Sequence, residues 1–138
     1  MFDDDLHNVI PRRFRLDLFA AVQSALRKQY EKNGKSVGDL CFEEEETEEG
    51  NAVCRTYRDS SEQTEAVIKY SFPCNAEITY KNGAVLTVWM KNVEWWHKNE
   101  PLVYVTSSGK NVDTLRFNVP RDHFDARLTA CIYKTFER

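Results

Sequence analysis

The sequence lacks any long hydrophobic run. The longest uninterrupted apolar stretch, residues 18–22, has five residues, whereas a helix needs about 20 to span a bilayer. The first residues, MFDDD, are acidic, unlike the basic start of a secretory signal. We therefore expect a chain that is made in the cytoplasm and has no membrane partner.

Cysteine and glycine are also sparse, and neither forms a functional motif. The four cysteines include no Cys-x-x-Cys pair, and the five glycines match no phosphate-binding loop. No Asn-x-Ser/Thr glycosylation site is present. We expect reduced thiols that pack as small hydrophobic groups, with no metal, no cofactor and no nucleotide chemistry. The thiols belong to Cys41, Cys54, Cys74 and Cys131.

Charge is segregated along the chain, although the net charge is only −3. Residues 1–11 carry −3, residues 12–35 carry +5, residues 36–65 carry −8 and residues 66–138 carry +3. Such segregation favours head-to-tail contacts between copies, or docking onto a charged partner. The alternative is that these charges are simply solvated.

One helix is predicted over residues 12–34, after an acidic N-terminal arm at residues 1–11. Pro11 suits the first helical position, and Gly34 supplies the stop. Between them, apolar residues recur at spacings of three and four, which places them on one helix face. They are Leu18, Phe19, Val22, Ala25, Leu26 and Tyr30.

After Gly34 the hydrophobic pattern changes to the period of two that is typical of strands. The predicted strands are 37–48, 51–59, 63–72, 75–81, 84–95, 101–107, 112–119 and 126–136. The pair Asn82-Gly83 predicts a tight hairpin turn. We therefore predict one α+β domain over residues 1–138, with an N-terminal amphipathic helix and an antiparallel meander or sandwich of about six to eight strands over residues 36–137.

The predicted strand 84–95 is apolar on both faces, which indicates that both are covered, by the rest of the chain or by another subunit. Trp95 and Trp96 point in opposite directions if the strand continues through them, so only one can enter the same core. Trp89, Trp95 and Trp96 are therefore candidate interface residues. The alternative is that the second tryptophan covers the helix within one subunit.

The most unusual composition is an acidic run at residues 43–49. It lacks the interleaved Gly, Asn and Ser of a calcium loop. As an exposed arm it could repel nucleic acid or mimic a row of phosphates; as an edge strand its like charge would prevent aggregation. The carboxylates of this acidic arm are those of Glu43, Glu44, Glu45, Glu46, Glu48 and Glu49.

No catalytic signature is found. Glu94 and His97 are three positions apart at a predicted strand end, where they would point to opposite faces. The sequence Asp-His-Phe-Asp at residues 122–125 is typical of a solvated turn. We expect no enzymatic activity and assign no catalytic residue.

These observations favour a structural or assembly subunit of a larger complex, of the type found in virion connectors and tails. Its partners would be other protein subunits, copies of the same chain first, with no sequence-specific nucleic-acid binding. One alternative is an acidic inhibitor that mimics nucleic acid. A second is a module of helix and curved sheet that binds a small ligand; its pocket would be lined by Tyr80, Trp89, Tyr104 and Phe117.

Overall fold

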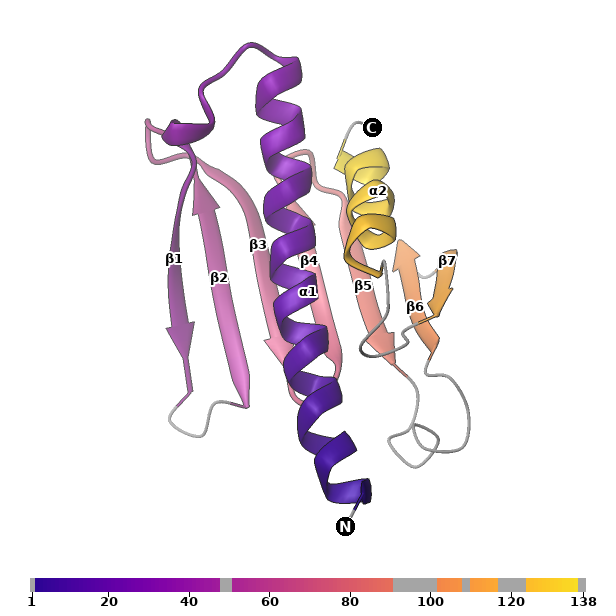
Figure 1. Ribbon diagram of the computed structural model, residues 1–138. Coiled ribbons are helices and arrows are strands. Elements are labelled where there is room, and N and C mark those ends of the chain that lie inside the picture. Colours follow the sequence, from indigo (N-terminus) through magenta and orange to yellow (C-terminus); the bar gives the residue numbers. More distant parts are fainter. Residues whose placement is uncertain (1, 48–50, 91–101, 108–109, 117–123, 137–138) are drawn as a thin grey trace.

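The described residues fold into a seven-stranded antiparallel sheet and two α-helices, which confirms the predicted α+β class. The computed structural model describes residues 2–47, 51–90, 102–107, 110–116 and 124–136 (Figure 1). Its elements, in chain order, are α1 (Phe2–Lys32), the short 3-10 helix η1 (Val37–Asp39), β1 (Cys41–Glu46), β2 (Ala52–Arg58), β3 (Thr64–Ser71), β4 (Asn75–Tyr80), β5 (Val85–Met90), β6 (Leu102–Ser107), β7 (Lys110–Arg116) and α2 (Phe124–Phe136).

The sheet is a simple meander in which each strand pairs with its neighbour in sequence. β1 and β7 therefore form its two edges, as Figure 1 shows at the left and right. The predicted Asn-Gly turn joins β4 to β5, where Gly83 has a φ of 87° and the Ala84 N–H donates to Asn82 Oδ1 at 2.8 Å. The described strands form one sheet, so the meander alternative holds and the sandwich alternative does not.

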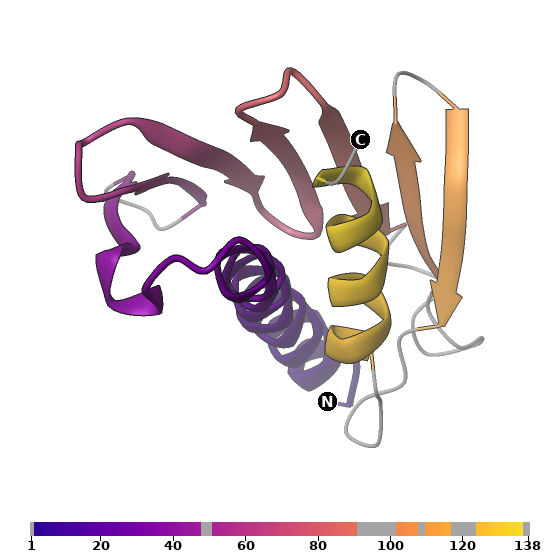
Figure 2. The same ribbon diagram turned by 90° about the horizontal axis from the view of Figure 1, so that it is seen from above.

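Both helices lie on the same face of the sheet, which curves around them (Figure 2). We call this the inner face and the opposite one the outer face. Alternate residues of the central strands are buried on the inner face, among them Ile68, Ile78 and Leu86, and they form one core with the buried stripe of α1. All six residues of the predicted helix stripe are in this core or buried beside it. The pattern of spacings therefore located the inner helix face correctly.

The N-terminal helix is longer than predicted. It begins at Phe2, so the expected acidic arm over residues 1–11 is helical from residue 2, and Pro11 lies inside the helix and is buried. An acidic segment is favourable at a helix start because of the helix dipole, so this composition suits a first turn as well as an arm. The predicted stop is close: the helix ends at Lys32, and Gly34 follows with a φ of 71°.

The predicted strand at residues 126–136 is wrong, because this segment lies in α2. Its β-branched and aromatic residues favour a strand, but its buried residues recur at helical spacing. The antiparallel region therefore ends at β7 and does not reach residue 137. The buried side chains of α2 are Leu128, Thr129, Cys131, Ile132 and Thr135.

Neither helix combines the length and the hydrophobicity of a membrane-spanning segment within the part of the chain that the structure describes.

We expect Ile132→Ala to lower the free energy of unfolding by about 2–5 kcal/mol, because the fully buried side chain would leave a cavity between α2 and the sheet. Urea unfolding followed by circular dichroism measures this. Lys134→Ala on the exposed side of the same helix should change the value by about 0.5 kcal/mol or less. Equal effects of the two substitutions would contradict the helical packing of α2.

Candidate functional site

The acidic run predicted to form an arm begins as an edge strand, β1. All six of its residues are exposed, and among the described strands it pairs with β2 alone. In the strand register, Phe42, Glu44 and Glu46 lie opposite Tyr57, Arg55 and Val53, so they share the inner face with α1. Residues 48 and 49 of the predicted acidic arm lie outside the described residues.

Arg55 of β2 holds the middle of β1. Its Nε and Nη2 donate to Glu44 Oε1 at 3.0 and 2.8 Å, and its Nη1 donates to the Tyr57 hydroxyl at 3.1 Å. The guanidinium lies 4.3 Å from the ring centroid of Phe19 and 4.1 Å from that of Phe42. It is therefore sandwiched between an α1 ring and a β1 ring while it pairs with a β1 carboxylate.

Burial shifts the pKa values of Arg55 and Tyr57. It lowers the pKa of Arg55, but the hydrogen bonds to Tyr57 and Glu44 outweigh that effect and leave the pKa above its ordinary value. Burial also raises the pKa of Tyr57, against the lowering effect of Arg55. Both groups therefore keep their ordinary charge at neutral pH.

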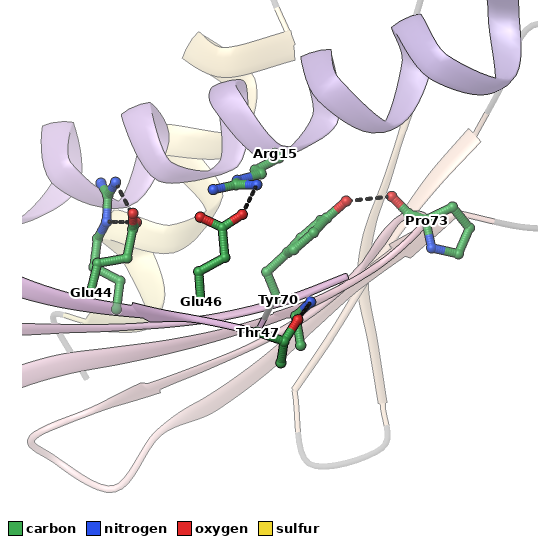
Figure 3. A network of polar contacts seen from close by, with 8 residues as sticks. Arg15, Glu44, Glu46, Thr47, Tyr70 and Pro73 are labelled. Atoms are coloured by element: carbon green, nitrogen blue, oxygen red, sulfur yellow. Dashed lines mark hydrogen bonds and ion pairs between the residues drawn. The ribbon is translucent and has the colours of Figure 1, made fainter. Parts of the chain in front are cut away.

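Arg15 of α1 holds the end of β1. Its Nη1 donates to Glu46 Oε1 at 3.3 Å, and its guanidinium lies 5.8 Å from the Tyr70 ring centroid. Figure 3 shows Glu46 pointing from the strand toward Arg15, with Glu44 beside it. At the same strand end, the Thr47 N–H donates to the Ala52 carbonyl oxygen at 3.0 Å, and Thr47 Oγ1 accepts from the Ala52 N–H at 3.2 Å. The edge strand is thus anchored to the helix and to its neighbour.

The outer side of β1 presents two glutamates. Glu43 lies 3.8 Å from Arg58, and its side chain is 77% exposed, so this pair is weak. Glu45 makes no ion pair within the described part of the chain. An open hollow of about 410 Å³ lies where β1 ends and is lined by residues of the first three strands from both faces of the sheet, Glu45 and Glu46 among them. The outer side of this edge is therefore acidic and accessible.

A second polar cluster surrounds the buried carboxylate of Glu65, which is 2% exposed. The Tyr30 hydroxyl donates to its Oε1 at 3.1 Å. Lys81 Nζ lies 3.0 Å from its Oε2, without the alignment of a hydrogen bond. Next to this pair, the Tyr80 hydroxyl donates to Gln29 of α1. The cluster fastens the C-terminal end of α1 to β3 and β4.

The candidate interface tryptophans are only partly described. Trp89 lies on the outer face, half-buried, and stacks on Tyr104 with ring centroids 4.7 Å apart. Trp95 and Trp96 lie outside the described residues. Both described helices cover the inner face (Figure 2), so among the described elements none covers the outer face of β5, and of the two expected sources of cover another subunit stays a prediction.

The aromatic residues expected to line a ligand pocket do not share a face. Tyr80 is buried on the inner face, whereas Trp89 and Tyr104 lie on the outer one. Phe117 lies outside the described residues. The sheet therefore separates the residues that this hypothesis requires to meet.

The described residues show no cluster for metal binding and no thiol with a lowered pKa. The four thiols are all free, and burial raises the pKa of Cys74 and of Cys131, which disfavours the thiolate. No group of three or more His, Cys, Asp or Glu side chains within the described ranges is arranged to hold a metal. The candidate pair Glu94 and His97, and Asp122 and His123, fall outside them.

Two residues that organise β1 were not singled out as its partners from the sequence. Arg15 was considered only within the +5 charge of residues 12–35, and Arg55 carried no prediction. Their roles depend on which strand lies under which turn of α1, and this is visible only in three dimensions. The sequence signal for the pairing with Glu44 was that Arg55 is the first basic residue after the acidic run.

The comparisons with known proteins add no assignment: the chain matches no protein-family model, and no curated protein or solved structure is similar to it.

We expect Arg55→Lys to lower the free energy of unfolding by about 1–3 kcal/mol, because lysine cannot keep the two bonds to Glu44 while it stacks between two rings. Urea unfolding measures the change. Arg58→Lys at the exposed pair with Glu43 is the matched control and should cost about 0.5 kcal/mol or less. If Arg55→Lys is no worse than this control, the anchoring of β1 is wrong.

The cluster around Glu65 predicts instability at high pH. Burial, and then Glu65, raises the pKa of Tyr30 above its ordinary value of 10.0, so above that pH the unfolded chain loses a proton that the folded protein keeps. The free energy of unfolding should therefore be unaffected by this tyrosine below pH 10 and should fall above it, by up to about 1.4 kcal/mol per pH unit.

Urea unfolding between about pH 9 and pH 11 tests this effect, since Tyr30→Phe should make the decline shallower. Tyr104→Phe, on the outer face, is the control. Identical slopes in the wild type and in Tyr30→Phe would show that Tyr30 does not contribute.

Proposed function

We propose that this chain is a non-enzymatic subunit of a larger protein assembly and that it makes its contacts through the edge strand β1. The observation that carries the proposal is an edge strand whose six residues are all exposed but whose position is held by α1 and β2. An edge strand presents unpaired N–H and C=O groups, which a strand of a partner can complete.

The anchoring of β1 supports a role in recognition. Arg55 and Arg15 fix the strand from the inner face, so little conformational entropy remains to be lost when a partner adds a strand. Phe42 remains 46% exposed beside this edge, which adds apolar area to a contact. A strand that served only to end the sheet would need neither the stacked arginine nor the exposed ring.

The arrangement that fits best is a closed ring of the kind found in virion connectors and tails. A meander with two different edges can repeat around an axis, and successive copies then bring one edge against the other. Glu43 and Glu45 would place negative charge along the assembled surface, and such charge would repel a passing nucleic acid. This function implies a cytoplasmic protein that is later incorporated into a particle.

The inhibitor alternative has less support. A mimic of phosphates needs carboxylates that are free to meet a basic cleft, whereas Glu44 and Glu46 are already paired with Arg55 and Arg15 of the same chain. Only Glu43 and Glu45 face outward among the described glutamates of the run. The outer charge is therefore too sparse for an extended row.

Light scattering behind a sizing column, over a concentration series at low and high salt, tests the proposal. We expect a mass that is a multiple of 16.2 kDa. Phe42→Ser should weaken association about tenfold or more, because it removes an exposed ring at the contact edge. Phe72→Ser, which removes a 52% exposed ring in the β3–β4 turn, is the matched control. A wild-type chain that stays monomeric under all conditions would refute the proposed function.

A further inference from the structure

We infer that β1 of one copy pairs with β7 of a second copy, so that the sheet continues from chain to chain; this rests on the proposed function. The two strands are the opposite ends of the sheet order, and each has a described neighbour on one side only. The partner is therefore a second copy of this chain, and its contact surface is the edge that β1 does not use.

Exposed apolar side chains gather at both edges. Phe42 of β1 is 46% exposed, Val112 of β7 is 40% exposed, and Leu102 of β6, next to β7, is 37% exposed. Large apolar side chains left at an open strand edge favour association. Contact between the two edges would cover side chains on both of them at once.

The charges of the two edges favour this pairing over the symmetric one. The sequence of β1, CFEEEE, has four acidic residues and no basic one, whereas that of β7, KNVDTLR, has two basic residues and one acidic one. Two β1 strands side by side would bring the glutamates of both copies together, which is destabilising. The acidic edge thus blocks self-pairing of β1 and leaves β7 as the compatible edge.

The directions of the strands also fit. In a meander of seven strands the first and the last run the same way, so two copies placed side by side with their helices on the same face bring β7 and β1 together as a parallel pair. Thr114 lies opposite Tyr104 and thus shares the outer face with Glu43 and Glu45. The described outer side chains of β7 therefore bring no carboxylate against these glutamates.

Such a contact joins two different surfaces, so it leaves one free edge on each side of every dimer. Repetition then gives a ring if the rotation closes and a filament if it does not. In a two-fold dimer, by contrast, the two edges left open are the same strand, so the contact between them cannot repeat.

A charge-exchange experiment tests the pairing. One variant, Glu43→Lys/Glu45→Lys, makes the outer side of β1 basic; the other, Lys110→Glu/Thr114→Glu, makes β7 acidic. Each variant alone should associate at least about tenfold more weakly than the wild type: the first puts the lysines of β1 against the basic β7, and the second puts the glutamates of β7 against the acidic β1. An equal mixture of the two should recover the wild-type mass, since every contact between unlike copies then joins unlike charges. Light scattering measures all of these masses.

The control Glu31→Lys/Glu77→Lys makes the same change in charge as the β1 variant, but at exposed positions of α1 and of the central strand β4, and should leave the mass unchanged. Circular dichroism confirms that each variant is folded. A wild-type multimer that persists in both edge variants, or a mixture that fails to recover it, would overturn the pairing while leaving the proposed function intact. A monomeric wild type would instead refute the proposed function itself.

Disulfide trapping gives a second readout that does not depend on charge. In a Cys41→Ser background, chains with Glu43→Cys and chains with Thr114→Cys should form a mixed disulfide dimer on mild oxidation, because the two outer sides meet in the parallel pair. In the control mixture, chains with Glu31→Cys take the place of the chains with Glu43→Cys. Equal yields in the two mixtures would contradict the contact between β1 and β7.

Discussion

The structure depends on covering one apolar face of a meander. Alternate residues of the central strands point to the same side, and a sheet with such a face is stable only when another layer buries it. α1 and α2 supply that layer, one from each end of the sequence, and they also contact one another. Because both helices lie on the inner face, α1 can reach β1 through Arg15 while the outer side of that edge stays open. The anchoring of β1 is a direct consequence.

Arg55 shows how this anchoring works at the margin of the core. A guanidinium below a helix is costly to bury unless its hydrogen bonds and charge are matched. Here a carboxylate, a hydroxyl and two aromatic rings surround it. The same contacts that satisfy the arginine hold Glu44 in place, so the acidic edge is stiff where a free run of glutamates would be mobile. An ordered open edge is what strand addition by a partner requires.

The sequence predicted the strands well because their period of two is a local signal. Each of the strands β1 to β7 falls within or beside a predicted segment, and the turn at Gly83 followed from two residues alone. The prediction failed at α2, where Thr, Ile, Tyr and Phe favour a strand one residue at a time while burial against α1 and the sheet selects a helix. The partners of the acidic run were not predicted, for a similar reason: Arg15 and Glu46 are 31 positions apart, so no local pattern connects them.

The contact between α1 and α2 joins the first and the last described elements. During synthesis, the strands can pair in order as they emerge, because each needs only its predecessor. The apolar stripe of α1, in contrast, lacks its last partner until α2 has left the ribosome. The helix is therefore incompletely covered while the seven described strands are being made, and its apolar stripe is open to chaperones during that time.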